Sequence, residues 1–433
     1  MQRAVKSFRS KNIEQFKTRL LNWSQNFDTA VWLDSNKHKE NHSSIEGVLA
    51  AGTHKKISSD YKGAFNKLKN FQTQHKDYLF GFLGYDLKND IENLKSKNKD
   101  GLDFPDLFFF QPKKLIFISG NTVSFKYLST YTDEIAKDFE DIENTSSNIT
   151  SVENKNIKLK LRIHKDAYLD KVEHILNHIH RGDIYEANFC QEFYSENSTI
   201  NPVRVYDSLN KISKAPFATF LKFDNKFLLS ASPERYLKKT GTTIISQPIK
   251  GTAKRALSEQ EDNLLKKQLE TDPKERAENI MIVDLVRNDL SRIAVKGSVK
   301  VNELCKVYSF KQVHQMISTI SSEIPVNIHP VDIIKNSYPM GSMTGAPKIK
   351  AMKIIEEQEE TKRGLYSGAV GYFTPDGDFD FNVIIRSILY NEKNKFVSYS
   401  VGSAITSLSV AEKELEECLL KAKAMREVLL STN

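Results

Sequence analysis

Short strand-like segments separated by turn residues constrain the fold of this chain more than any other feature. Within residues 105–130, the run "PDLFFFQPKKLIFISGNTVSFKYL" alternates apolar stretches with Pro, Gly and Asn, which is typical of antiparallel strands. Similar runs predict strands at "YEANFCQEFYS", "FATFLKFDNKFLLSAS", "TTIISQPI" and "KFVSYSVGSAI". In "YSGAVGYFTPDGDFDFNVIIRSILY", Pro375-Asp376-Gly377 predicts a hairpin turn between two further strands.

Amphipathic helices are predicted at three places between and after these strands. Apolar residues recur at helical spacing around residues 165–181, and a final helix is predicted over about 409–430. A third helix is predicted from about residue 272, with Asp272 as its N-cap and Pro273 in its first turn. Because strands and helices alternate without a regular β-α-β period, the pattern favours an α+β fold with extensive antiparallel sheet.

Composition places the chain among ordinary globular proteins. Its 433 residues are 39% hydrophobic and 27% charged, enough for two to three domains with a large core. The net charge of +8 is spread among interspersed Lys and Glu, without a basic and aromatic module, so we expect no nucleic-acid partner. Three widely spaced cysteines (Cys190, Cys305 and Cys418) argue against a disulfide framework or a zinc site and for a reducing compartment.

The N-terminal stretch "MQRAVKSFRSKNIEQFKTRLL" has scattered charges and no apolar core, so it is not predicted to be a secretory signal. No apolar run approaches the ~18 residues that a membrane span needs. We therefore expect a cytoplasmic protein with no membrane partner.

Two of the predicted helices each carry a pair of glutamates three residues apart. Glu275 and Glu278 share one helix face, Glu414 and Glu417 share another, and Lys421 follows one turn later. If the two faces meet, the four carboxylates need an offsetting positive charge, and Mg²⁺ prefers such oxygen ligands. On spacing alone, however, solvated helix faces explain the glutamates as well.

Seven motifs together resemble a known family. In chain order they are "GDIYEANF", "SASPERYL", "QPIKGTAKR", "DPKERAENIMIVDLVRNDLSRIAVKGSVKV", "GSMTGAPKIKAM", "YSGAVGYF" and "ELEECLLKAKA". They resemble the chorismate-utilising enzymes, which include anthranilate synthase component I, aminodeoxychorismate synthase component I, isochorismate synthase and salicylate synthase. The resemblance covers roughly residues 165–430 and is weaker at "AVWLDS" (30–35) and "LFGFLGYDL" (79–87).

The resemblance implies a fold and a domain organisation. The fold is α+β, with two intertwined subdomains whose antiparallel sheets form a sandwich flanked by helices, as in anthranilate synthase component I. Residues 1–145 are then an N-terminal subdomain, 146–160 a polar linker or excursion, and 161–433 the chorismate-binding catalytic domain. The polar, Asn- and Ser-rich character of residues 141–157 suits a linker.

Lys250 in "PIKGT" resembles the lysine of the aminodeoxychorismate synthase branch, where most other branches have alanine. The resemblance implies that its amine attacks C2 of chorismate while the C4 hydroxyl leaves. Ammonia then enters at C4 and expels the lysine, giving 4-amino-4-deoxychorismate for para-aminobenzoate and folate synthesis. The amine must be neutral to attack, and a desolvated pocket or a neighbouring Mg²⁺ is expected to lower its pKa from about 10.4.

Further roles follow from the resemblance, position by position. Thr252 and Glu275 join Lys250 as catalytic candidates, and Mg²⁺ is the expected cofactor. The expected metal ligands are Glu278, Glu414 and Glu417. The expected substrate-binding residues are Gly251, Thr344, Tyr366, Arg386, Gly402 and Lys421.

Three departures from the family pattern stand out. Gln315 occupies the place of a histidine found in anthranilate synthases, and His314, one residue earlier, is either a core histidine or a catalytic one. Glu186 stands where amine-transferring relatives usually have Gln and water-adding relatives have Lys, and its purpose is unexplained. In "SVGSAIT", Ser403 and Ala404 replace part of a glycine-rich loop.

The resemblance also implies partners. No G-x-C-x-G nucleophile motif surrounds any cysteine, so ammonia is expected from a separate glutamine amidotransferase subunit. The "WLDS" segment resembles a place where relatives hold tryptophan, which makes tryptophan near Ser35 a second candidate ligand. Two alternative functions stay open: anthranilate synthase component I, and a chorismate- or tryptophan-binding regulatory protein without turnover.

Overall fold

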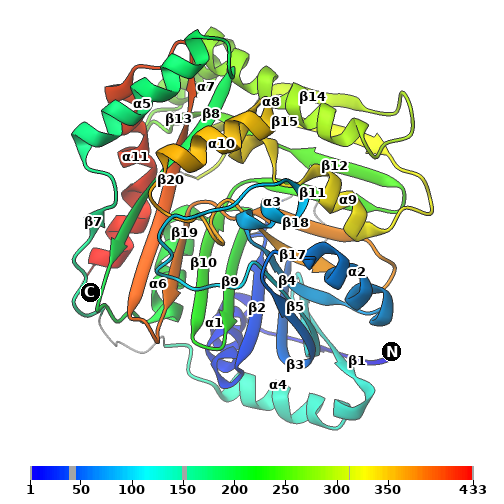
Figure 1. Ribbon diagram of the computed structural model, residues 1–433. Helices are drawn as coiled ribbons and strands as arrows, with labels where there is room; N and C mark the ends of the chain where they lie inside the picture. Colours follow the sequence, from blue (N-terminus) through cyan, green and yellow to red (C-terminus); the bar gives the residue numbers. More distant parts are fainter. Residues whose placement is uncertain (1, 39–44, 149–153, 312, 432–433) are drawn as a thin grey trace.

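A computed structural model describes residues 2–38, 45–148, 154–311 and 313–431 (Figure 1). Twenty strands in these residues form one hydrogen-bonded network in which every paired strand is antiparallel to its neighbour. The predicted α+β fold with a large antiparallel sheet is therefore confirmed.

The larger half of the network curves from the N-terminal strand to the strand that carries Glu186. In order of pairing, its strands are β1 (Arg3–Arg9), β6 (Thr122–Leu128), β5 (Leu107–Ser119), β3 (Gly47–Ser59), β2 (Thr29–Asp34), β9 (Phe217–Phe223), β10 (Lys226–Ser232), β19 (Ser387–Asn391), β20 (Phe396–Thr406) and β8 (Glu186–Ser195). The short strands β7 (Lys160–Leu161) and β16 (Gly345–Ala346) both pair with β8.

The smaller half branches from β5. Its strands are β4 (Leu79–Leu83), β17 (Ala369–Phe373), β18 (Phe379–Val383), β11 (Arg235–Thr240), β12 (Thr243–Gln247) and β15 (Val313–Glu323), which pairs with both β13 (Ile249–Lys254) and β14 (Lys300–Ser309). A buried apolar layer joins the two halves face to face, with Val31 and Leu221 from the larger half and Phe82 and Val370 from the smaller. This arrangement is the sandwich that the resemblance implied.

Helices cover the outer faces of both halves. Against the larger half lie α1 (Ile13–Trp23), α4 (Glu134–Asn144), α5 (Lys165–His180), α6 (Pro202–Ser213), α10 (Lys348–Gln358) and α11 (Ala411–Leu430). Against the smaller half lie α2 (Ala64–Gln74), α3 (Lys88–Ile91), α7 (Glu259–Thr271), α8 (Pro273–Ser291) and α9 (Pro330–Ser337). Single 3₁₀ turns occur at η1 (Ser24–Asn26), η2 (Tyr85–Leu87), η3 (Ser129–Tyr131) and η4 (Gly341–Met343).

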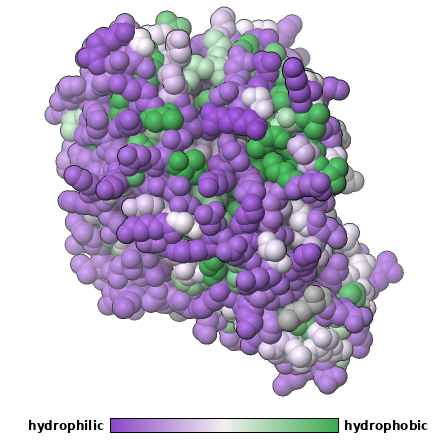
Figure 2. All heavy atoms as spheres, turned by 45° about the vertical axis from the view of Figure 1, so that its right-hand side comes forward, coloured by the Kyte–Doolittle hydropathy of each residue, from purple (hydrophilic) through white to green (hydrophobic). Residues whose placement is uncertain are grey.

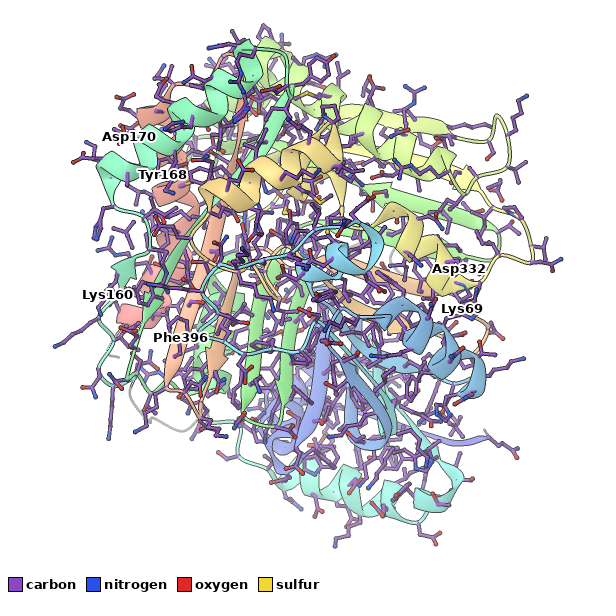
Figure 3. All side chains as sticks on the ribbon, in the orientation of Figure 1. Lys69, Lys160, Tyr168, Asp170, Asp332 and Phe396 are labelled. Carbon is purple, nitrogen blue, oxygen red and sulfur yellow. The ribbon has the colours of Figure 1, made fainter. Side chains whose placement is uncertain are left out.

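The N-terminal and C-terminal parts of the chain are interleaved. Strand β2 lies between β3 and β9, and β4 lies between β5 and β17, so strands from early in the chain pair directly with strands from late in the chain. The side chains of Lys69 on α2 and Asp332 on α9 form an ion pair of 2.5 Å, visible at the right of Figure 3. The two predicted subdomains are thus intertwined.

Local sequence signals explain several of these elements. Asp272 caps α8 by accepting a hydrogen bond from the Glu275 backbone N–H at 2.9 Å, and Pro273 begins the helix, as predicted. The Pro-Asp-Gly turn joins β17 to β18, with Gly377 at φ +78°.

The polar segment 141–157 differs in part from the prediction. Residues 141–144 complete helix α4, because Ile135 and Ile142 bury an apolar face against the sheet. Residues 149–153 of this segment lie outside the described residues.

The face seen in Figure 2 is mainly hydrophilic, with hydrophobic side chains gathered in its upper right part. Among the described residues, no helix is long and apolar enough to cross a membrane.

Candidate active site

Lys250 lies on β13, where the strand crosses the helix α8. Its backbone carbonyl accepts a hydrogen bond from Asn279 Nδ2 of α8 at 3.0 Å. The next residue, Gly251, has φ +102°, and a Cβ there would lie 3.1 Å from both Glu275 Oε2 and Met316 Cβ. A glycine is therefore required for β13 to approach α8 so closely, which is what fixes the direction of the lysine side chain.

The Lys250 ammonium is largely buried and meets carboxylates from three elements. Its Nζ lies 3.1 Å from Glu278 Oε2 on α8. Burial alone would lower the pKa of Lys250, but the carboxylates of Glu278, Glu186 and Glu417 outweigh it, so the pKa is raised above its usual value. Desolvation therefore acts in the expected direction, but the neighbouring carboxylates reverse it, and the protein groups alone do not give the expected net lowering of the Lys250 pKa.

The two glutamate pairs predicted on separate helices do face each other. Lys274 Nζ lies 3.7 Å from Glu278 Oε1 on α8 and 3.7 Å from Glu414 Oε1 on α11. On α11, Glu417 Oε1 lies 2.6 Å from Lys421 Nζ. The carboxylates of α8 and α11 thus share a small space in which lysine ammonium groups supply positive charge.

Two of these glutamates, one on each helix, carry shifted pKa values. Burial raises the pKa of Glu275, and the neighbouring Glu278 carboxylate raises it further. Burial would also raise the pKa of Glu417, but Lys421 and Lys250 reverse that effect and lower it overall. Glu275 and Glu417 are therefore not independent surface charges, because each responds to charged groups of the same site.

The carboxylate group suits a hard cation, although no closed metal site is formed. Among the described residues, no three His, Cys, Asp or Glu side chains converge closely enough to hold a metal ion as they stand. The Oε1 atom of Glu278 is nevertheless buried and without a hydrogen-bond partner, and the oxygens of Glu414 and Glu417 come from the facing helix. Carboxylate oxygens of this kind are the ligands that Mg²⁺ takes.

Glu234 is a functional candidate that the sequence reasoning missed, although its motif "SASPERYL" was one of the seven. It lies between β10 and β11, is 3% exposed, and its Oε1 accepts a hydrogen bond from Ser342 Oγ at 2.6 Å. Burial raises the pKa of Glu234 to about 7, although Ser342, Lys250 and Arg386 act in the opposite direction. A carboxyl group with this pKa holds a proton for part of the time at neutral pH.

Arg386, predicted to bind substrate, is a half-buried cation without a partner among the described residues. It lies between β18 and β19 with φ +49°, and its backbone carbonyl accepts a hydrogen bond from the Ala231 N–H at 3.1 Å. Its guanidinium makes no hydrogen bond or ion pair with any residue that the structure describes. Burial lowers the pKa of Arg386, and Glu234 is the one carboxylate that opposes this. Such a group is suited to bind an anion.

Glu186, at the start of β8, lies near Lys250 and Glu278. It is 2% exposed, and burial raises its pKa to about 7, with Lys250 lowering it and Glu278 raising it. Its Oε2 atom has no hydrogen-bond partner among the described residues.

Of the remaining predicted residues, some contact this group of charged side chains and others do not. Lys421 Nζ also donates to the Gly402 carbonyl at 2.9 Å, which links two predicted substrate-binding positions. Thr252 is exposed and pairs in register with Gln315 on β15. In contrast, no hydrogen bond among the described residues joins Thr344 or Tyr366 to Lys250: the Thr344 hydroxyl donates to Gly341 O at 3.1 Å, and the Tyr366 hydroxyl contacts Cys190 Sγ at 4.0 Å.

His314 is a structural residue. It is 1% exposed, its Nε2 lies 3.0 Å from Asp262 Oδ1 on α7, and its Nδ1 lies 2.9 Å from Ser309 Oγ on β14. Both ring nitrogens are thus occupied in bracing α7 against the sheet. Of the two interpretations open from the sequence, the structure favours the core histidine.

A cavity also lies beside Ser35, the residue predicted to be near bound tryptophan. It is lined by Asp34 and Thr219 from the larger sheet half and by Arg235 and Asn382 from the smaller half. Tryptophan binding there stays a prediction.

The site is therefore a largely buried lysine among carboxylates, together with an arginine that has no partner among the described residues, on an antiparallel sandwich. The family described as chorismate binding enzyme matches residues 25–427, and the chain belongs to this family. A Bacillus subtilis protein named aminodeoxychorismate synthase component 1 is 32% identical over 361 residues, covering 81% of this chain and 76% of the relative.

Two further comparisons extend this result. A rice protein named "Probable aminodeoxychorismate synthase, chloroplastic" is 33% identical over 412 residues, covering 84% of this chain but only 45% of the relative, so the chain spans about half that protein's length. The crystal structure of anthranilate synthase component I from Streptococcus pneumoniae superposes with a TM-score of 0.78 at 26% identity, covering 90% of this chain and 94% of that one. The fold is thus of the anthranilate synthase component I type.

Proposed function

We propose that this protein is an aminodeoxychorismate synthase component I. It converts chorismate and ammonia to 4-amino-4-deoxychorismate, and the ammonia comes from a separate glutamine amidotransferase. The observation that carries the proposal is Lys250, whose largely buried amine lies among carboxylates. Lys250 and Arg386 both act on the pKa of Glu234, and the Arg386 guanidinium has no partner among the described residues. The relatives named aminodeoxychorismate synthase support the same substrate.

Lys250 acts as the nucleophile. Its neutral amine forms a bond to C2 of chorismate while the ring double bonds shift and the C4–O bond breaks. The departing hydroxide takes a proton and leaves as water. Glu234 and Glu186, with pKa values raised to about 7, are the carboxyl groups of this site able to hold such a proton at neutral pH.

Ammonia completes the exchange. Its lone pair forms the C4–N bond, the C2–N bond to Lys250 breaks, and the lysine regains a neutral amine. Arg386 binds a carboxylate of chorismate through its two-pronged guanidinium, which holds the ring beside Lys250. Two displacements in place of one leave the amino group on the carbon that lost the hydroxyl.

Mg²⁺ is the proposed cofactor. Glu278, Glu414 and Glu417 would hold it, and when bound it would neutralise the carboxylates that raise the Lys250 pKa and offset charge on the substrate.

The direct test is to identify the product of purified protein with chorismate, Mg²⁺ and ammonium. We expect a product whose mass corresponds to replacement of hydroxyl by amine with the enolpyruvyl group retained. Fluorescent anthranilate with pyruvate would instead assign the activity of the Streptococcus pneumoniae relative. Binding of chorismate without any product would assign a regulatory role.

Lys250→Ala tests the covalent step. We expect aminodeoxychorismate formation to fall by about 10³-fold or more while the dissociation constant of chorismate changes little, because only the nucleophile is lost. Lys254→Ala, an exposed lysine on the same strand, is the matched control and should keep its activity. Equal turnover of Lys250→Ala and wild type would remove the covalent step from the proposal.

A further inference from the structure

Strand β13 contains a β-bulge at the residue that carries the amine. The register of β13 with β15 shifts between Ile249 and Thr252, so Lys250 and Gly251 lie opposite the single residue Met316. A bulge of this kind interrupts the ladder of backbone hydrogen bonds and redirects the side chains that it carries. The position of Lys250 is therefore not fixed by strand pairing alone.

Asn279 of α8 holds both sides of this bulge. Its Nδ2 donates hydrogen bonds to the Lys250 carbonyl at 3.0 Å and to the Met316 carbonyl at 3.3 Å. Its Oδ1 accepts a hydrogen bond from Ser318 Oγ at 2.5 Å, and that hydroxyl accepts one from the Cys305 backbone N–H at 2.9 Å. Because two carbonyl oxygens face one end of this buried amide, only its NH₂ end can point toward the bulge.

Two adjacent residues of α8 therefore contact the two ends of Lys250. Asn279 binds its backbone carbonyl, and Glu278 Oε2 lies 3.1 Å from its Nζ. A movement of the bulge relative to α8 would displace the amine from the place where these contacts hold it. Displacing a reacting group by about 1 Å can slow a reaction by about 100-fold.

We propose that Asn279 is a positioning residue for the Lys250 nucleophile, because its two donated hydrogen bonds hold the bulge of β13 against α8. The inference rests on the proposed function. Asn279 takes no part in making or breaking bonds and acts only through the backbone of Lys250. Removing its amide should slow the attack of the amine on C2 of chorismate, while chorismate binding through Arg386 changes little.

The test compares buried substitutions within one hydrogen-bond network. Asn279→Leu keeps a side chain of similar size and removes both N–H donors, and Asn279→Ala removes them with a smaller side chain in case the leucine variant does not fold. Ser318→Ala is the matched control, because it also removes a buried hydrogen bond but leaves both N–H donors on the bulge.

For each variant we would measure the free energy of unfolding and the dissociation constant of chorismate. We would also measure, by intact mass, the rate at which the covalent adduct forms with chorismate when ammonium is left out. The adduct rate reports the position of the nucleophile, which a general loss of stability in a folded protein does not change.

We expect both Asn279 variants to form the adduct about 100-fold more slowly than wild type, with a change of less than about threefold in the dissociation constant of chorismate. Ser318→Ala should form the adduct within about threefold of the wild-type rate, although it also loses stability. A wild-type rate in the Asn279 variants, an equal loss of rate in Ser318→Ala, or a loss of affinity as large as the loss of rate would overturn the proposal. Failure of the wild type to form any adduct would instead refute the covalent step of the proposed function, and the role of Asn279 with it.

Discussion

Buried charges are treated differently in the N-terminal part of the molecule and in the candidate active site. In the N-terminal part, Lys114 Nζ lies 2.5 Å from Asp138 and 2.6 Å from Glu134, and Arg3 donates to both oxygens of Asp77 at 2.8 and 2.9 Å. In the site, by contrast, neither the Arg386 guanidinium nor Glu186 Oε2 has a partner in the part of the chain that the structure describes.

This difference indicates that the N-terminal ion pairs stabilise the fold, whereas the charged groups of the candidate site bind ligand. Removing a charged group from water is costly in both regions, and a partner charge offsets the cost. The N-terminal pairs offset it within the fold, so they contribute to folding. In the site, part of the desolvation free energy of the charged groups is not offset by the protein. A ligand that supplies the missing partner offsets it, and this contributes to the free energy of binding.

Lys114→Met should give the largest effect on stability. It leaves Asp138 buried without its cation, and breaking a buried pair in this way lowers the free energy of unfolding by about 3–5 kcal/mol. Activity at a temperature where the variant stays folded should match wild type. Urea unfolding measures the first effect and product formation the second; a loss below about 1 kcal/mol would show that the N-terminal pairs do not serve the fold.

Glu234→Gln should change how stability depends on pH. The pKa of Glu234 is raised from 4.5 to about 7 in the folded protein. The folded state therefore binds this proton more tightly than the unfolded chain, and the resulting stability is present below pH 4.5 and lost as the pH rises through 7. The variant should gain about 3–4 kcal/mol relative to wild type as the pH rises between these limits, because each pKa unit corresponds to about 1.4 kcal/mol.

Chemical unfolding of both proteins across this pH range, with chelator present, checks the expectation for Glu234. Parallel curves for wild type and variant would show that the Glu234 pKa is not raised by burial.

Arg386→Met should weaken chorismate binding by about 30-fold, since one charge-assisted hydrogen bond contributes about 2 kcal/mol. Its free energy of unfolding should not fall, because the guanidinium has no partner to lose in the described structure. Arg3→Met is the control and should show the reverse, with lower stability and unchanged binding. A loss of stability in Arg386→Met without a change in chorismate affinity would show that Arg386 stabilises the fold, as the N-terminal pairs do, and does not bind substrate.

Local signals in the sequence predicted local structure well. The Asp272 cap, the Pro-Asp-Gly hairpin and the helix that begins at Lys165 each depend on neighbouring residues, and the structure confirms all three. The facing of the two glutamate pairs was also anticipated, although the spacing alone could not distinguish it from two solvated helix faces.

Contacts between distant segments could not be predicted in this way. The hydrogen bond from Ser342 to Glu234 joins the 3₁₀ turn η4 to the connection between β10 and β11, and nothing in the sequence near "SASPERYL" predicts it. The raised pKa of Lys250 has the same origin, since Glu278, Glu186 and Glu417 come from three separate elements. The domain boundaries at 145 and 161 stay predictions.

The interleaved strands have a consequence for how the protein is made. Leu83 of β4 pairs with Ala369 of β17, and Ala30 of β2 pairs with Lys222 of β9. On the ribosome, the early strands must therefore emerge with exposed edges and wait until most of the chain has been translated. We expect chaperones to protect these edges during synthesis. We also expect that neither the N-terminal nor the C-terminal part of the chain forms a native sheet when it is expressed alone.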